Sequence, residues 1–454
     1  MQRICIKNFN VVKDADIDIE NVLLLIGEQA SGKSTISKII YFFKSLRIDL
    51  LRLINEHKDS NVALAPLFRK RIRDKFYNYF GSTRHVAKFN ITYYYSPNKY
   101  IQLSLNKDHS LRTFISESFY TKIFNEARRL MRKIEEASKK NGFYETIEAE
   151  TAIQSYRDEL QRIMNQLFED DHEPLFIPAG RNITVTYSEQ FQLYFFGDLN
   201  SILNTRKSKD ESIDMYLMLE FLHKVKSFSD RFKGKDFLSL IRTAGDVAPD
   251  VNKQILFFAR EKIADILKGE YRHDEYGEKI YYSQKEYVHL NNASSGQQEA
   301  IRILQDIFFN LLDQANVFRV IEEPEAHLYP DAQKQLIEMI AVMLNSSDSQ
   351  VVITTHSPYI LSIFNNLLFA TKVVKTNENL RQAVDTIIPQ LTWLHPHTFQ
   401  AYCLEKGKAT SIFDETTGMI EENFLDDISD DMGSDFDTLY QFYRDSLKNS
   451  KALT

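Results

Sequence analysis

The sequence predicts an α/β fold in which a mixed and partly parallel sheet is flanked by helices. Three short apolar runs support this prediction. Residues 22–26 lead into a glycine-bounded loop, residues 316–321 end at two adjacent glutamates, and residues 351–353 end at Thr354-Thr355-His356. Helical spacing of apolar residues lies between such runs, as in sheets whose strands alternate with helices. Because ligands bind at the carboxyl ends of strands in open parallel sheets, the ends of these runs form the candidate functional site.

The composition is ordinary for a soluble globular protein. The chain has 454 residues, of which 43% are hydrophobic and 26% charged, and its formal net charge is −7. This acidity argues against general coating of nucleic acid but leaves room for a local basic surface. Cys5 and Cys403 do not make a disulfide framework and suit a reducing cytosol. The polar start is unlike a signal peptide, and no apolar run approaches the roughly 18 residues of a membrane helix, so we expect a cytoplasmic protein.

The stretch from Asn21 to Tyr41 fits a phosphate-binding loop. Within it GEQASGKS matches G-x-x-x-x-G-K-[ST] between a strand and a helix, the context that this motif requires. Amide groups at the helix N-terminus would face the phosphates, Lys33 would reach the β- and γ-phosphates, and the Ser34 hydroxyl would bind Mg²⁺. The alternative is a Gly/Ser-rich turn without a ligand. The residues expected to bind ATP are Gly27, Glu28, Gln29, Ala30, Ser31, Gly32, Lys33, Ser34 and Thr35, the last of which opens the helix.

Two adjacent carboxylates, Glu322 and Glu323, follow the second apolar run. At a strand end both side chains can reach one site, where one can hold Mg²⁺ through water and the other can polarise an attacking water. The alternative is a solvated glutamate pair. Arg319 inside the run must be paired or must lie at the sheet edge.

Two further features lie near the expected strand ends. His356 follows the third run and would lie beside the phosphates, although a single histidine is often structural. Residues 290–312 form a helical pattern in which Ser295 and Gln298 fit a capping box. Ser294, Ser295 and Gly296 would then stand at a helix N-terminus with free amides. A well-capped helix without a ligand is the alternative.

The rest of the chain divides around these motifs. Residues 2–20 predict two short strands, residues 89–105 a hairpin, and residues 113–170 an antiparallel helical hairpin. The expected divisions are residues 1–112 (main domain), 113–170 (helical insertion), 171–209 (main domain), 210–270 (helical segment), 271–400 (main domain) and 401–454 (C-terminal extension).

Together these motifs resemble the ABC-type ATPase heads shared by SMC, RecF and OLD-family proteins. Residues 176–181 (FIPAGR) and 323–328 (EPEAHL) are more particularly similar to the AAA-15/AAA-21 branch, which includes the OLD nucleases and the ATPases of the Septu and PARIS anti-phage systems. The resemblance implies an ATPase head with Walker A at residues 27–35, a metal-binding Glu322, a catalytic Glu323 and a switch histidine at His356. It also implies a signature motif formed by Ser294, Ser295, Gly296 and Gln297, which would act on the nucleotide of a second head.

Three departures from the family pattern stand out. Ser295 replaces the usual signature glycine, and Glu322 replaces the usual aspartate. The Q-loop glutamine has only Gln190 and Gln192 as candidates. Glu405-Lys406-Gly407 weakly echoes the start of a Toprim nuclease, but the next aspartates, Asp426 and Asp430, come too soon after it. We therefore recognise no nuclease domain.

The resemblance implies two functions of different classes. The first is an immune ATPase that senses phage infection and controls a separate effector, expected to be a nuclease. The second is a DNA-repair or chromosome-maintenance ATPase that clamps DNA, and a transporter ATPase is a distant third. The expected cofactors are ATP and Mg²⁺. The expected partners are a second head in a homodimer or higher oligomer, and DNA if a basic surface is exposed. The candidate basic residues are Arg69, Lys70, Arg71, Arg73, Lys75, Arg128, Arg129, Arg132 and Lys133.

Overall fold

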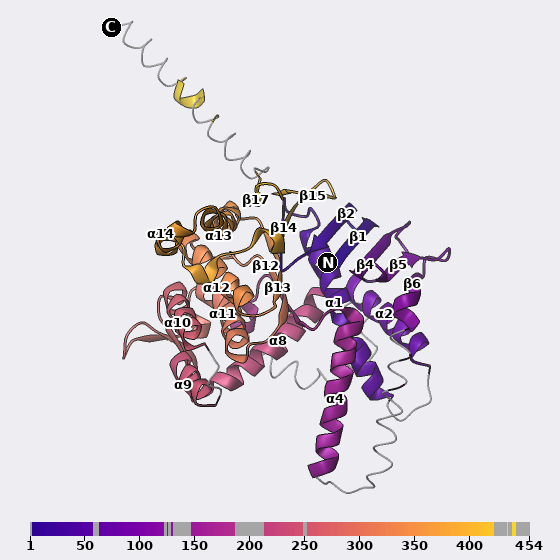
Figure 1. The fold of residues 1–454 in the computed structure, drawn as a ribbon, viewed down its shortest axis with the longest axis horizontal. Coiled ribbons are helices and arrows are strands. Elements are labelled where there is room, and N and C mark those ends of the chain that lie inside the picture. Colours follow the sequence, from indigo (N-terminus) through magenta and orange to yellow (C-terminus); the bar gives the residue numbers. More distant parts are fainter. Residues whose placement is uncertain are drawn as a thin grey trace.

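An eleven-stranded mixed sheet runs through the molecule (Figure 1). The computed structural model describes residues 2–57, 63–121, 147–186, 213–247 and 252–421, together with residues 125, 129, 434 and 438–441. The strands of the large sheet are β1 (Gln2–Phe9), β2 (Val12–Ile19), β3 (Val22–Gly27), β4 (Asn90–Ser96), β5 (Lys99–Leu105), β6 (Leu111–Ile115), β7 (Glu173–Ile177), β12 (Val317–Glu322), β13 (Gln350–Thr355), β14 (Phe399–Glu405) and β15 (Lys408–Ser411).

The sheet has a parallel part and an antiparallel part. Its spatial order is β6-β5-β4-β1-β2-β15-β14-β3-β13-β12-β7. The last five strands of this order are parallel to one another, whereas among β6, β5, β4, β1 and β2 neighbouring strands are antiparallel. The predicted mixed α/β class is therefore confirmed. The parallel part places the ends of β3, β13 and β12 at one edge.

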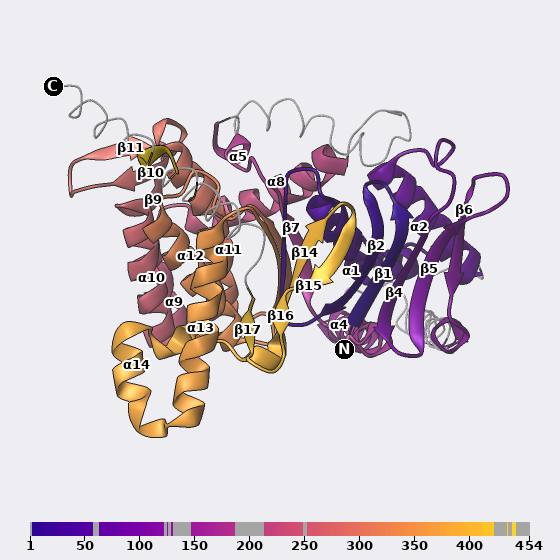
Figure 2. The same ribbon diagram turned by 90° about the horizontal axis from the view of Figure 1, so that it is seen from above.

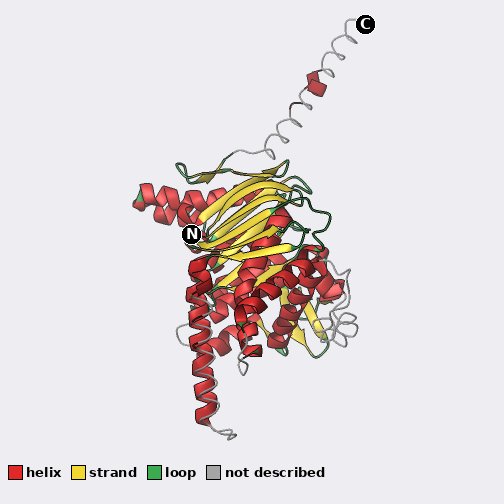
Figure 3. Cartoon of the chain, turned by 90° about the vertical axis from the view of Figure 1, so that its right-hand side faces the viewer, coloured by secondary structure: helices red, strands yellow, loops and turns green. Residues whose placement is uncertain are grey.

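Helices cover both faces of the sheet, as the views from above and from the side show (Figures 2 and 3). One face packs on α1 (Lys33–Glu56), α2 (Leu64–Phe80) and α4 (Ile147–Phe168), and α4 continues away from the sheet as a projecting helix. The other face is covered by α8 (Ile213–Phe232), α11 (Ser295–Asp313), α12 (Pro330–Ser346) and α13 (Pro358–Thr376). Beyond them, α10 (Lys253–Leu267) packs on α11 and α12, and α9 (Phe237–Val247) packs on α10. Two short helices, α5 (Ile183–Thr186) and α14 (Arg381–Ile387), complete the described α-helical part. Short 3₁₀ helices lie at Leu290–Asn292, Glu378–Leu380, Gln390–Thr392 and Pro396–Thr398.

The alternation of side chains along β3 explains how one strand serves both cores. Val22, Leu24 and Ile26 belong to the core of the α8–α13 side. Leu23 and Leu25 belong to the core of the α1 side. A strand buried on both faces reads as a continuous apolar run, because successive side chains point to opposite faces of the sheet.

A small second sheet lies at the end of the α8–α13 side. It consists of β8 (Lys235–Asp236), β9 (Glu270–Asp274), β10 (Gly277–Tyr281) and β11 (Tyr287–His289), and a separate pair is formed by β16 (Phe413–Asp414) and β17 (Met419–Ile420). Among the described residues, no helix combines the length and apolarity needed to cross a bilayer.

The structure departs from the expected divisions at two places. Residues 113–115 belong to β6 and not to a helix, because Leu111 and Ile115 are buried beside β5. The second arm of the expected helical hairpin is present as α4, while most of residues 122–146 lie outside the described residues. At the other end, β14 begins before residue 401 and is an integral strand beside β3. The predicted C-terminal extension therefore starts inside the main sheet.

Candidate nucleotide-binding and catalytic site

Three neighbouring parallel strands bring the predicted site residues to one edge of the sheet. In register, Thr355 of β13 lies beside Ile26 of β3, and Thr354 lies beside Glu322 of β12. The residues that follow these strands are therefore adjacent in space although they are far apart in the sequence. This arrangement follows from the parallel topology, which places all carboxyl ends at the same edge.

The phosphate loop has the backbone that its glycines predict. Gly27 has a φ of 149°, and a Cβ added there would lie 2.5 Å from the carbonyl oxygen of Leu404 on β14. Gly32 is the left-handed N-cap of α1 with a φ of 113°. The helix starts at Lys33, two residues earlier than expected. The loop is thus closed on one side by β14 and presents a helix N-terminus on the other, which suits an anionic phosphate group.

Lys33 is held inside this loop. Its side chain is 5% exposed, and Nζ donates hydrogen bonds to the carbonyl oxygens of Gly27 (2.7 Å) and Glu28 (2.8 Å). Burial lowers the pKa of Lys33, and the charges of Glu323 and Glu325 oppose that effect. Carbonyl oxygens are weaker partners for an ammonium group than phosphate oxygens are, so the lysine can exchange them for a bound nucleotide.

Glu322 fits the predicted metal position. It is 6% exposed, and its Oε2 lies 3.5 Å from the amide of Ala179. Burial raises the pKa of Glu322, while the charge of Lys38 and the Ser34 hydroxyl act in the opposite direction. Within the described residues, Oε1 is buried without a hydrogen-bond partner. A buried, unpartnered carboxylate oxygen beside a hydroxyl is suited to Mg²⁺, which prefers oxygen ligands.

Glu323 lies at the turn that follows β12. Its φ is 45°, a left-handed conformation that is uncommon for a residue with a side chain, and its amide donates to the carbonyl of Thr354 (2.9 Å). The carboxylate is half exposed, and its Oε1 lies 3.7 Å from His356 Nε2. Such a carboxylate can reach a water molecule beside the phosphate loop, whereas Glu322 is too enclosed to do so.

His356 is positioned by a residue that the sequence interpretation did not assign. Glu325 Oε1 accepts hydrogen bonds from Thr355 Oγ1 (2.7 Å) and from the His356 amide (2.9 Å). Burial, reinforced by the charge of Lys33, lowers the pKa of His356. The imidazole is therefore neutral near pH 7 and can exchange a hydrogen bond with a phosphate oxygen. A glutamate two residues after the acidic pair was the available signal for Glu325.

The signature segment needs one correction. The capping box at the start of α11 is formed by Ser294 and Gln297 and not by Ser295 and Gln298. Gln298 points back instead and donates to backbone carbonyls, among them that of Leu290 (3.1 Å). The predicted capping box would start the helix at Gly296, but α11 starts at Ser295, so Ser294 is the N-cap.

The predicted signature residues lie apart from the predicted site residues around Lys33. Ser294 and Ser295 are exposed, and Gln297 Nε2 donates to the carbonyl of Leu267 at the end of α10 (2.6 Å). Lys33, Glu322, Glu323 and His356 thus form one group, and the signature side chains lie outside it. The Q-loop candidates Gln190 and Gln192 lie outside the described residues.

Comparison with known families agrees with this geometry. Residues 1–361 match the AAA ATPase domain family AAA_15. The chain belongs to this family. Among curated proteins, none matches the chain.

Solved structures that resemble this AAA ATPase domain include three SMC heads. They are an SMC head bound to the C-winged helix domain of ScpA (12% identity, TM-score 0.40, covering 90% of this chain and 96% of that chain), an SMC head from Thermotoga maritima (11%, 0.35, 90% and 97%) and one from Pyrococcus furiosus with an extended coiled coil, bound to the C-terminal domain of ScpA (14%, 0.35, 91% and 96%).

Arg181 is a second residue whose role the sequence left unassigned. It follows β7, is fully buried, and lies between the turn after β12 and the helix α11 of this ATPase domain. Its guanidinium donates to the carbonyls of Glu322 (2.9 Å) and Glu323 (3.1 Å). An arginine directly after the strand and loop PLFIPAG was the signal available in the sequence.

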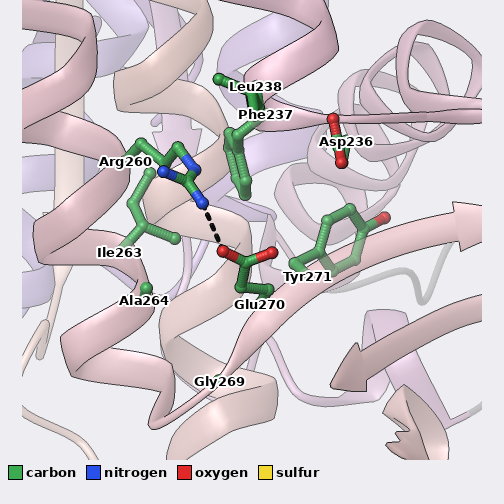
Figure 4. A pocket seen from close by; sticks show the side chains of 9 residues that line it. All are labelled: Asp236, Phe237, Leu238, Arg260, Ile263, Ala264, Gly269, Glu270 and Tyr271. Carbon is green, nitrogen blue, oxygen red and sulfur yellow. Dashed lines mark hydrogen bonds and ion pairs between the residues drawn. The ribbon is translucent and has the colours of Figure 1, made fainter. Parts of the chain in front are cut away.

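Outside these motifs the structure has a small pocket that is open to solvent (Figure 4). It is formed between α9, α10 and β9, and an ion pair between Arg260 and Glu270 crosses it. Its lining residues are Asp236, Phe237, Leu238, Arg260, Ile263, Ala264, Gly269, Glu270 and Tyr271. None of these is a residue of the nucleotide motifs of the ATPase domain.

Proposed function

We propose that this chain binds ATP with Mg²⁺ and hydrolyses it to ADP and phosphate at the edge formed by β3, β13 and β12. The observation that supports this proposal best is the convergence of Lys33, Glu323 and His356. Lys33 Nζ lies 3.5 Å from His356 Nδ1, and the other ring nitrogen lies 3.7 Å from Glu323. A phosphate-binding cation, a candidate base and a neutral imidazole are thus within reach of one γ-phosphate.

Each residue has a defined task in this proposal. The loop amides and Lys33 bind the β- and γ-phosphates, and Glu323 orients and polarises the attacking water. Neutral His356 contacts a γ-phosphate oxygen, and this contact is lost when the γ-phosphate leaves. Ser34 and Glu322 would hold Mg²⁺, which when bound neutralises phosphate charge. Hydrolysis then changes the contacts of the phosphate loop. The free energy of ATP hydrolysis would therefore drive a conformational change of the heads.

The proposed active form is a dimer of heads, within a homodimer or a higher oligomer. Ser294, Ser295, Gly296 and Gln297 of one head would meet the γ-phosphate held by the other head. Support comes from the exposure of the two serines and from the capped start of α11, where free amides and the positive end of the helix dipole favour a phosphate. ATP hydrolysis should therefore depend on protein concentration.

The proposed biological role is that of a sensor in prokaryotic anti-phage defence that controls a separate effector protein, expected to be a nuclease. The support is the resemblance of the FIPAGR and EPEAHL segments to the ATPases of such systems. A cytoplasmic location suits this role. The test is plaque formation on cells that carry this gene with its neighbouring genes. Lost protection with the Lys33→Ala variant supports the role, and equal plaque counts with and without the wild-type genes contradict it.

The second proposed function is an ATPase that clamps DNA, for which α2 offers a partly exposed basic surface. Lys70 and Arg73 are exposed, and the guanidinium of Arg69 lies over the ring of Tyr120 (5.1 Å). Arg71 is paired with Glu56 (2.9 Å) and Lys75 with Asp49 (2.6 Å), so part of the predicted basic charge is neutralised within the protein. Of the second basic cluster only Arg129 lies within the described residues.

A further inference from the structure

We propose that Arg181 is a positioning residue that makes the catalytic turn after β12 and the signature helix α11 move as one unit. The proposal rests on the head dimer described above. In that dimer the catalytic turn of one chain serves its own nucleotide, while the start of α11 serves the nucleotide of the partner. Arg181 would therefore couple the two ATP sites of the dimer.

The contacts of Arg181 show how one side chain joins the two elements. The guanidinium is 0% exposed. Nη1 donates to the carbonyl oxygens of Glu322 (2.9 Å) and Pro178 (3.2 Å), and Nη2 donates to that of Glu323 (3.1 Å). On the opposite side, Nε donates to the carbonyl of Glu299 in α11 (3.1 Å) and lies 3.2 Å from its carboxylate. The planar fork of arginine allows all these bonds at once, whereas lysine offers a single nitrogen.

These bonds bear directly on the candidate base. Glu323 has a left-handed backbone, which is strained for a residue with a side chain and persists only where the surroundings fix it. Its amide is held by Thr354 and its carbonyl by Arg181. Since the direction of a side chain follows its backbone, Arg181 fixes where the Glu323 carboxylate points. A misplacement of about 1 Å at a reacting group costs about a hundredfold in rate.

Two further contacts tie α11 to β12 and its turn. Asp306 of α11 forms a buried ion pair with Arg319 of β12 (2.6 Å). Gly296, in the signature, lies so close to His327 that an added Cβ would be 2.6 Å from the His327 carbonyl oxygen. The start of the signature helix thus contacts the segment after β12, Glu299 reaches the catalytic turn through Arg181, and Asp306 in the second half of the helix contacts β12. A rotation of α11 would carry the catalytic turn with it.

The first experiment measures the rate and the affinity for ATP separately. Arg181→Lys keeps the charge but loses the fork, and Glu299→Gln keeps the shape but loses the ion pair. Both should lower kcat by about a hundredfold while the Kd for a fluorescent ATP analogue stays within about twofold. Arg302→Lys is the matched control, because Arg302 is a buried arginine of the same helix that pairs with Glu278 (2.7 Å), away from the catalytic turn. Its kcat should stay within about threefold of wild type.

The second experiment tests coupling between the sites. An excess of chains that carry both Lys33→Ala and Arg181→Lys is mixed with wild-type chains, so that most wild-type chains are in mixed dimers. In a mixed dimer the only active site then has a wild-type phosphate loop and a wild-type Glu323, but receives its signature from the altered chain. Its rate should be about fivefold lower than that of the same mixture made with Lys33→Ala alone.

The outcomes separate this inference from the proposed function. An inactive wild-type protein contradicts the proposed function itself. An active wild type with normal kcat in both Arg181→Lys and Glu299→Gln contradicts the positioning role. The coupling is contradicted if Arg181→Lys lowers kcat but the mixture with the double variant hydrolyses ATP as fast as the mixture with Lys33→Ala alone. Arg181 would then act only within its own site. Loss of folded protein in both variants, seen as lost cooperative unfolding, would also contradict it by showing a purely structural role.

Discussion

Nδ1 of His356 lies 3.5 Å from the ammonium nitrogen of Lys33, so the residue after β13 contacts the phosphate loop after β3. The same imidazole reaches Glu323 on the turn after β12, where Nε2 and Oε1 are 3.7 Å apart. One ring therefore spans three parallel strands at the edge where a nucleotide would bind. In the proposed mechanism His356 would therefore respond to the presence of the γ-phosphate.

Lys33→Ala should abolish nucleotide binding. The loop amides would remain, but the charge that meets the β- and γ-phosphates would be lost, and carbonyls of Gly27 and Glu28 would lose their partner. Titration with a fluorescent ATP analogue measures this effect. Lys7→Ala on β1, an exposed lysine paired with Asp14, is the control and should bind normally. Unchanged affinity of Lys33→Ala would contradict the assignment of the phosphate loop.

Ser294→Arg should block hydrolysis and leave ATP binding intact, because the bulky side chain would enter the proposed interface and not the phosphate loop. The test is to mix Ser294→Arg chains with Lys33→Ala chains, each inactive alone. In a mixed dimer both lesions fall in one composite site and the other site is intact. Partial recovery of ATPase activity is expected, and no recovery at any mixing ratio would count against action across the dimer.

The strands of the site could be predicted from the sequence because they are buried on both faces. A strand buried on both faces has no polar positions, so β3, β12 and β13 stand out as apolar runs. Their ends then locate Gly27, Glu322 and Thr355 without further information. The apolar run also explained Arg319, which is paired with Asp306 as expected of a buried charge.

What the sequence did not reveal depends on contacts between distant segments. Leu404 closes the phosphate loop from β14, a strand that lies far along the chain, and no local pattern signals such a pairing. The roles of Arg181 and Glu325 rest on backbone carbonyls and amides that their side chains reach in space. The capping box was misplaced by one residue because Ser294 and Ser295 are both good caps with a glutamine three residues later.

Glu278→Gln should destabilise the protein by about 3 kcal/mol at neutral pH, because it leaves the buried Arg302 without its ion-pair partner. Burial would raise the pKa of Glu278, but Arg302 outweighs it and the pKa falls from 4.5 to about 2. The pair therefore stabilises the fold above the ordinary pKa, and this contribution is lost as the pH falls from 4.5 towards 2.

Thermal unfolding at pH 7 and at pH 3 measures this pH dependence. The difference in midpoint between wild type and Glu278→Gln should be smaller at pH 3, because the unfolded wild type then binds a proton that the folded state refuses. Glu275→Gln, an exposed glutamate between β9 and β10, is the control and should shift neither midpoint. A difference that is constant with pH would contradict the coupling of Glu278 to Arg302.

If the DNA-clamping function applies, binding should be strongly salt-dependent. Neutralising about six phosphates gives a slope of log affinity against log salt of about −5. Charge reversal at Arg69, Lys70 and Arg73 on α2 should flatten that slope, whereas reversal of the paired Arg71 should do less. Fluorescence anisotropy with a labelled duplex, with and without ATP, measures it. No salt-sensitive binding by the wild type would favour the ATPase that controls a separate partner.

The central claim is that Glu323 polarises the water that attacks ATP bound at the β3 edge. Its most direct test is single-turnover hydrolysis of radiolabelled ATP by wild type, Glu323→Gln and Glu322→Gln, with binding measured in parallel. We predict that Glu323→Gln binds ATP as the wild type does but cleaves it at least about a hundredfold more slowly, the scale expected for loss of a general base. Unimpaired cleavage by Glu323→Gln together with no cleavage by Glu322→Gln would contradict the claim.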